Sequence, residues 1–186
     1  MTITNELELA VLFRDACAVK RYHTVRTLRQ QTVGEHTMGI LTLLNQIYPE
    51  ARKEVLLAVM HHDFPELVTG DIPAPIKRQI PRLALLLNEA EEGTAPLHQD
   101  FDLSAFEEAV VKFCDLMELV LWCLEECRMG NQYARLPLEN GLMWLWGAVL
   151  VLRHPSTMET ALPLLKQATH AALNAGANPS LMEKTK

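Results

Sequence analysis

Apolar residues recur at helical spacing through almost the whole chain, and no convincing run of alternating apolar and polar residues indicates a strand. Val33, Ile40, Leu44 and Ile47, for example, fall on a single face of a helix. The same spacing predicts helices over residues 5–19, from Thr32 to Pro49, and over 51–62, 76–90, 104–129, 137–153 and 157–174. We therefore predict an all-α protein in which residues 1–186 form a single compact bundle of about seven helices.

Local signals support these boundaries. Thr32 is followed three positions later by Glu35, and Ser104 by Glu107, which is the spacing of a helix capping box. Prolines and a glycine within residues 65–75 predict a turn and a loop between two helices. Two further segments are expected to lack regular structure: a mobile loop at 91–103 and a frayed tail at about 175–186.

Composition excludes some function classes. Of the 186 residues, 49% are hydrophobic and 22% are charged, and the net charge is -6, so we expect no binding to a nucleic-acid polymer, which needs a basic surface. No apolar run is long enough for a membrane helix, and the start MTITNELELA lacks the basic region of a secretory signal. The four cysteines have no CxxC spacing and are expected to be reduced, which favours a cytoplasmic protein.

Ionisable residues interrupt the apolar faces of three predicted helices. His36 lies within the stripe of the second helix, His62 and Asp63 end the third on its inward side, and Asp115 interrupts the long helix. A single buried histidine or aspartate is usually a hydrogen-bonded core residue. Four together need a source of positive charge, and imidazole with carboxylate suits a divalent transition metal such as zinc, cobalt, manganese or iron. A water molecule on that metal could act as a nucleophile near neutral pH.

The order His36, His62-Asp63, Asp115 resembles the metal-binding pattern of HD-domain phosphohydrolases. The stretches RQQTVGEHT, HHDFPELVTGDIPAPIK and KFCDLMELVLWCLEECRMGN are similar to the small bacterial 5′-deoxynucleotidases. They are equally similar to the related phage deoxynucleoside triphosphate (dNTP) triphosphohydrolases, including those acting on dATP. The resemblance covers most of residues 15–135 and implies an HD-domain fold, a metal held by these four residues, and control of a nucleotide pool.

The resemblance also implies roles for neighbouring residues. Glu66, four residues after His62, would orient and deprotonate the attacking water, and Asp71 would protonate the leaving oxygen or bind the sugar 3′-hydroxyl. Arg21 and Tyr22 match an arginine and an aromatic residue that bind substrate, although relatives often have tryptophan at the second position. Further substrate contacts are expected from Lys20, Lys77 and Pro75.

The basic residues bear on the substrate. Six of the chain's seventeen lysines and arginines flank the predicted site in sequence, namely Lys20, Arg21, Arg26, Arg29, Lys77 and Arg78. If all six converge, their charge exceeds what one phosphate requires, which favours a dNTP triphosphohydrolase; further divalent ions could accompany the phosphates. The alternative is a 5′-deoxynucleotidase acting on deoxynucleoside monophosphates (dNMPs).

More distant alternatives are a cyclic-nucleotide or alarmone hydrolase, a two-metal oxygenase of the same fold, and a non-catalytic nucleotide-binding module. The stretch GLMWLWGAVLVL is unusually apolar for a surface helix. It is expected either to be buried on all sides or to pack against another subunit, and we expect a homo-oligomer.

Overall fold

The computed structural model describes residues 5–152, 154–178 and 180, and these residues form an all-α structure. No strand occurs within these residues, where the one isolated bridge pairs Lys20 with Thr32. The elements, in chain order, are α1 (Glu6–Cys17), α2 (Val33–Ile47), α3 (Lys53–His61), α4 (Glu66–Thr69), α5 (Ala74–Gln79), α6 (Pro81–Glu92), α7 (Ala105–Arg128), the 3-10 turn η1 (Gln132–Ala134), α8 (Arg135–Val149) and α9 (Pro155–Asn174). The predicted fold class is confirmed.

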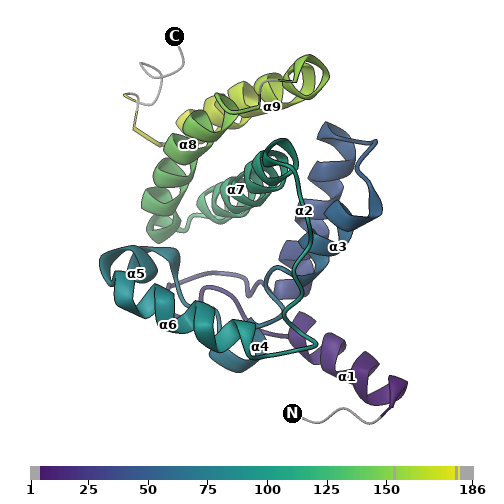
Figure 1. Cartoon of the computed structure of the whole chain (residues 1–186). Helices are drawn as coiled ribbons and strands as arrows, with labels where there is room; N and C mark the ends of the chain where they lie inside the picture. Colours follow the sequence, from purple (N-terminus) through teal and green to yellow (C-terminus); the bar gives the residue numbers. More distant parts are fainter. Residues whose placement is uncertain (1–4, 153, 179, 181–186) are drawn as a thin grey trace.

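The long helix α7 lies in the middle of the molecule, with α2 and α3 on one side and α8 and α9 on the other (Figure 1). Three of its apolar side chains, Phe113, Met117 and Val120, are completely buried. They pack against Leu44 of α2 and Leu142 of α8 in one continuous core. Asp115 also lies on α7, so the packing that buries the apolar residues of this helix brings the Asp115 carboxylate close to α2.

Both predicted capping boxes are present. The Thr32 side chain accepts a hydrogen bond from the Glu35 N–H, and the Glu35 carboxylate accepts one from the Thr32 N–H. Ser104 and Glu107 form the same pair. These caps satisfy backbone donors that would otherwise lack partners in the first turns of α2 and α7. They therefore fix the start of the two helices that carry His36 and Asp115.

The helix predicted over residues 76–90 is wrong in one respect, because the structure divides it into α5 and α6. The break lies at Ile80, whose φ of −125° and ψ of 79° are not helical. Pro81 is the cause, since its ring disfavours the helical conformation of the preceding residue while suiting the first position of a new helix. A second short helix, α4, occupies part of the predicted loop at 65–75 and begins at Glu66.

The remaining connections agree with the expected boundaries. No helix or strand is present between Gly93 and Ser104, although Leu97 in this loop is buried against α1. The tail predicted to be frayed is ordered at its start, where Ala177 is buried in the core and the Asn178 N–H donates a hydrogen bond to Glu139. Residues 179 and 181–186 lie outside the described residues. None of the described helices has both the length and the apolar character needed to cross a lipid bilayer. All four cysteines are free, as expected.

Candidate metal-centred active site

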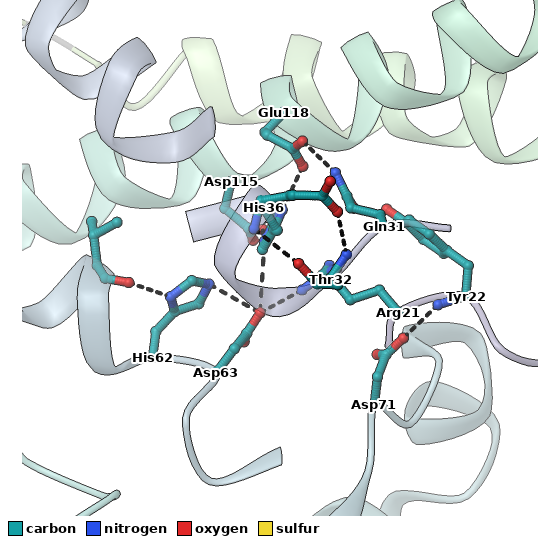
Figure 2. Close-up of polar contacts among 12 residues, drawn as sticks. Arg21, Tyr22, Gln31, Thr32, His36, His62, Asp63, Asp71, Asp115 and Glu118 are labelled. Atoms are coloured by element: carbon teal, nitrogen blue, oxygen red, sulfur yellow. Dashed lines mark hydrogen bonds and ion pairs between the residues drawn. The ribbon is translucent and has the colours of Figure 1, made fainter. Parts of the chain in front are cut away.

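Four side chains from three separate parts of the sequence meet between α2, α3 and α7 (Figure 2). The Nε2 atom of His36 lies 3.3 Å from Oδ1 of Asp115 and 3.6 Å from Oδ2 of Asp63. The Nε2 atom of His62 lies 3.3 Å from the same Asp63 oxygen. His36, His62 and Asp115 each offer a ligand atom within 4.8 Å of the other two. The predicted convergence of these residues is therefore present in the structure.

Hydrogen bonds fix which nitrogen of each imidazole is available. Nδ1 of His62 lies 2.6 Å from the carbonyl oxygen of Val59, and Nδ1 of His36 contacts the Glu118 carboxylate. Carbonyl and carboxylate oxygens accept hydrogen bonds, so both Nδ1 atoms carry a proton and both Nε2 atoms face the cluster. Nε2 of His36 is buried and makes no hydrogen bond within the described part of the chain. A buried nitrogen without a partner is well suited to bind a metal ion.

The electrostatic field in the cluster favours positive charge. Burial lowers the pKa of His62, but the charge of Asp63 and the hydrogen bond to it outweigh burial and raise this pKa to about 9. Burial raises the pKa of Asp63, yet His62 and Arg21 hold it well below its usual range. The pKa of Asp115 is likewise lowered, because its contacts with His36 and Lys112 outweigh burial. In the metal-free site the ionised carboxylates therefore hold a proton on the imidazole of His62. Once that proton leaves, two imidazole nitrogens and two carboxylates are a donor set that fits a divalent cation.

Glu66 and Asp71, the predicted catalytic residues, are both buried near this cluster. Burial, together with the charges of Asp63 and Asp71, raises the pKa of Glu66 to about 8. Its Oε2 atom is buried and has no hydrogen-bond partner among the described residues. Asp71 accepts a hydrogen bond of 2.8 Å from the backbone N–H of Tyr22. Glu66 therefore has a free oxygen for a proton, whereas one oxygen of Asp71 is already engaged.

Tyr22 adopts an uncommon backbone conformation beside the site. Its φ of 57° lies in the left-handed region, which costs an ordinary residue about 1–2 kcal/mol. In this conformation its N–H reaches Asp71, and its ring stacks on Trp122 with centroids 6.0 Å apart. Its hydroxyl is buried without a hydrogen-bond partner among the described residues. The adjacent Arg21 donates a hydrogen bond to Asp63 and so joins the cluster.

Comparison with known proteins identifies the family. The family model described as "5'-deoxynucleotidase YfbR-like" matches residues 10–136, which is more than half of the chain. The chain belongs to the YfbR-like 5′-deoxynucleotidase family. It is therefore a metal-dependent hydrolase of phosphoric esters, and the geometry of its cluster is suited to a divalent metal.

Relatives within the YfbR-like family are distant in sequence. A 5′-deoxynucleotidase of Erwinia tasmaniensis is 28% identical over 138 residues, which are 61% of this chain and 70% of that protein. The 5′-deoxynucleotidase YfbR of Salmonella arizonae is 24% identical over 184 residues, 84% of this chain and 88% of that protein. Among solved structures, the cyanophage S-2L HD phosphohydrolase DatZ, bound to dA and one catalytic Zn²⁺ ion, shares the fold with a TM-score of 0.64. It is 18% identical and the match covers 94% of this chain and 99% of DatZ.

The basic residues expected around this YfbR-like site do not all converge on it. Arg26 contacts the hydroxyl of Tyr133, Arg29 pairs with Glu125, and Arg78 lies over the ring of Trp144. The backbone of Lys20 pairs with Thr32. Lys77 is near enough to Glu66 to lower its pKa. Pro75 lies in α5, and its side chain is outside the described part of the structure. Arg21 and Lys77 are thus the two predicted cations with an observed influence on the cluster.

Two contributors to the site were not predicted. Glu118 contacts His36, and Gln31 donates a hydrogen bond of 2.7 Å to Glu118. Glu118 follows Asp115 by three residues, so both lie on the same face of α7. A second acidic residue within the apolar stripe of this helix is the sequence signal that could have identified Glu118. Gln31 has no such signal, because it lies outside the helix in a polar stretch. Trp122 is buried and its ring stacks against that of Tyr22.

Proposed function

We propose that the protein is a 5′-deoxynucleotidase, which hydrolyses a dNMP to a deoxynucleoside and phosphate. The observation that carries this proposal is the convergence of two imidazole Nε2 atoms and two carboxylates between α2, α3 and α7. Family membership supports the reaction class, and the names of the relatives support the substrate. The biological role would be control of a deoxynucleotide pool.

We assign His36, His62, Asp63 and Asp115 as the metal ligands. Zinc, cobalt and manganese are all compatible with two imidazoles and two carboxylates. Such a cation, when bound, polarises a phosphoryl oxygen and makes a water molecule more acidic. The protein's own contribution is to hold both imidazoles with Nε2 facing inward, through Val59 behind His62 and Glu118 behind His36.

Glu66 is the proposed general base. The attacking water gives its proton to the free Oε2 of Glu66 while its oxygen bonds to phosphorus, and the bond from phosphorus to the 5′ oxygen breaks. Glu66 can then pass this proton to the leaving 5′ oxygen, which restores the carboxylate. A divalent cation nearby would lower the pKa of Glu66 and favour the ionised form that accepts the proton.

The other predicted residues would bind the substrate. Arg21 and Lys77 carry the positive charge that a phosphoryl group requires. Asp71 already accepts one hydrogen bond from Tyr22, and its second oxygen is suited to accept one from the sugar 3′-hydroxyl. The ring of Tyr22, held against Trp122, would contact the sugar or the base.

A dNTP triphosphohydrolase is the second candidate. The sequence argument for it required six converging cations, but Arg26, Arg29 and Arg78 engage Tyr133, Glu125 and Trp144 instead. Arg21 and Lys77, the predicted cations that act on the cluster, together with a metal match the charge of one phosphate better than that of three. This charge balance supports the monophosphate substrate.

We also propose that the exposed face of α8 contacts a second subunit. Leu136 and Leu150 are 65% and 75% exposed. Met143 and Gly147 lie between them at helical spacing on the same face. A contiguous row of exposed apolar residues on one helix face is the kind of surface that contacts another protein.

The experiment is a phosphate-release screen over all four dNMPs, the matching ribonucleotides and the dNTPs. The protein is first treated with a chelator and then supplied with zinc, cobalt or manganese. We expect turnover of dNMPs that depends on added metal and is lost in Asp63→Asn. Asp100→Asn, which changes an exposed aspartate outside the cluster, serves as the matched control. Release of triphosphate from dNTPs without any turnover of dNMPs would favour the second candidate.

A further inference from the structure

We propose that Glu118 is a positioning residue that couples the metal ligand His36 to the segment carrying Arg21 and Tyr22. The inference rests on the proposed function, because it assigns a role to a residue behind the proposed metal site. Glu118 would not touch the substrate or the metal. It would act through its two carboxylate oxygens, each of which is engaged by a different part of the chain (Figure 2).

The first oxygen of Glu118 determines the state of His36. Oε2 accepts the hydrogen bond from Nδ1 of His36, which keeps the proton on that nitrogen and leaves Nε2 free for a metal. His36 is completely buried and Glu118 is 8% exposed, so water cannot replace this contact without rearrangement. A carboxylate behind an imidazole also makes the opposite nitrogen more basic, which strengthens its bond to a cation.

The second oxygen of Glu118 holds the segment before α2. Oε1 accepts a hydrogen bond of 2.7 Å from the side chain of Gln31, which is 3% exposed. The backbone oxygen of Gln31 accepts a hydrogen bond of 2.9 Å from the N–H of Arg21. The guanidinium of Arg21 in turn contacts Asp63. The contacts therefore form a closed circuit, from Glu118 through Gln31 and Arg21 to the cluster and back through His36.

The backbone of α2 has a space for this carboxylate. A Cβ atom added at Gly39 would lie 2.7 Å from Cγ of Glu118 and 3.2 Å from its Oε1. Both distances are shorter than ordinary van der Waals contact. Gly39 follows His36 by three residues on the same face of α2, so the absence of a side chain there lets Glu118 approach the imidazole.

Two other buried carboxylates on α7 provide a contrast. Glu107 pairs with Arg52, at 2.6 Å between Oε1 and the guanidinium Nε, and caps the helix start. Glu126 accepts hydrogen bonds from the backbone N–H groups of Leu28 and Arg29. Within the described residues, neither contacts a member of the metal cluster. Burial of a carboxylate on α7 is therefore not specific to Glu118, but its contact with His36 is.

The decisive measurement is the affinity of the metal-free protein for Co²⁺, followed by its visible absorption spectrum. In Glu118→Gln the amide has one acceptor oxygen and no charge, so the imidazole loses its ionic partner. We expect Co²⁺ to bind about tenfold or more weakly, in line with the loss of such partners elsewhere, and with an altered spectrum. Glu107→Gln is the matched control: it should lower thermal stability and leave Co²⁺ affinity and spectrum unchanged.

Gln31→Leu tests the second half of the circuit. This change keeps the contact between Glu118 and His36 but removes the link to the Arg21 segment. We expect Co²⁺ affinity to stay within about threefold, because the ligand and its partner are retained. The KM for a dNMP should rise more than kcat falls, because the altered segment would bind substrate rather than activate water. An unchanged KM would show that Gln31 transmits nothing to the Arg21 segment.

The outcomes separate this inference from the proposed function. If the wild-type protein binds Co²⁺ and Glu118→Gln binds it equally well with the same spectrum, the positioning role is wrong and the metal site stands. If His36→Ala binds Co²⁺ as the wild type does, the proposed metal site itself is wrong. Should Glu118→Gln not fold, Glu118→Asp replaces it, since a side chain shortened by one methylene keeps the charge but cannot reach both partners. The same loss of affinity is expected.

Discussion

Gly39→Ala should weaken metal binding although it changes no ligand and no charged residue. The added Cβ would lie 2.7 Å from Cγ of Glu118. Glu118 cannot swing aside freely, because its two oxygens are held by His36 and Gln31. The clash therefore either displaces Glu118 from the imidazole or pushes α2 away from α7.

The expected magnitude is a balance of opposing terms. Replacing glycine by alanine inside a helix gains about 1 kcal/mol. Overpacking a buried contact costs about 1–3 kcal/mol, and losing a hydrogen bond to a charged group costs about 1.5–3 kcal/mol. Taken together, these terms lower the free energy of unfolding of the metal-free protein by about 1.5–5 kcal/mol. Loss of the Glu118 contact should also weaken Co²⁺ binding about tenfold, which corresponds to about 1.4 kcal/mol.

Urea unfolding of the metal-free protein and Co²⁺ titration measure these two quantities separately. Gly147→Ala in α8 is the matched control, because nothing lies within 4 Å of the Cβ it would add. That variant should be stabilised by about 0.5–1 kcal/mol with unchanged metal affinity. If Gly39→Ala behaved in the same way as Gly147→Ala, the proposed role of the space above Gly39 would be refuted.

Three further results are expected. A general base must be deprotonated, and the pKa of Glu66 is raised to about 8 in the metal-free site by burial and by its acidic neighbours. The value of kcat/KM should therefore fall toward low pH, with a midpoint below pH 8 once metal is bound. Glu66→Gln should lower kcat about 10²–10⁴-fold and abolish this fall at low pH. Because Tyr22 has a φ of 57°, urea unfolding should show Tyr22→Gly to be about 1 kcal/mol more stable than Tyr22→Ala, the reverse of the usual order. Leu150→Glu, on the exposed face of α8, should dissociate any oligomer observed by light scattering, and an unchanged mass would exclude this face as the contact.

Much of the candidate site could be predicted from helical spacing. His36 and Asp115 interrupt apolar stripes, and a stripe in an amphipathic helix faces the core regardless of how the helices are arranged. Two such residues on different helices therefore had to enter one interior. The break at Pro81 could also have been predicted from the sequence, because proline restricts the backbone of the preceding residue locally.

The partners of surface and connecting residues could not be predicted in the same way. The role of Glu118 depends on how closely α7 approaches α2 at Gly39. The spacing of residues within one helix does not predict the distance between two helices. The basic residues show the same limit. Arg29 precedes His36 closely in sequence, yet it pairs with Glu125 at the far end of α7, because the connecting segment folds back along that helix. The number of basic residues that flank the metal-binding motif in sequence therefore did not predict how many of them lie at the metal cluster.

Removal of the metal should abolish nucleotide binding as well as turnover. The carboxylates of Asp63, Asp71 and Asp115 lie at the site, and two of the nearby cations are already paired, Arg21 with Asp63 and Lys112 with Asp115. A phosphate monoester brings a further charge of about −1.5 to −2 at neutral pH, so without a divalent cation it meets net repulsion. Calorimetric titration of a dNMP into Glu66→Gln, which should not consume it, can compare Co²⁺-loaded with chelated protein. Equal affinity in the two states would show that Arg21 and Lys77 suffice for the phosphate, and that the metal serves the attacking water alone.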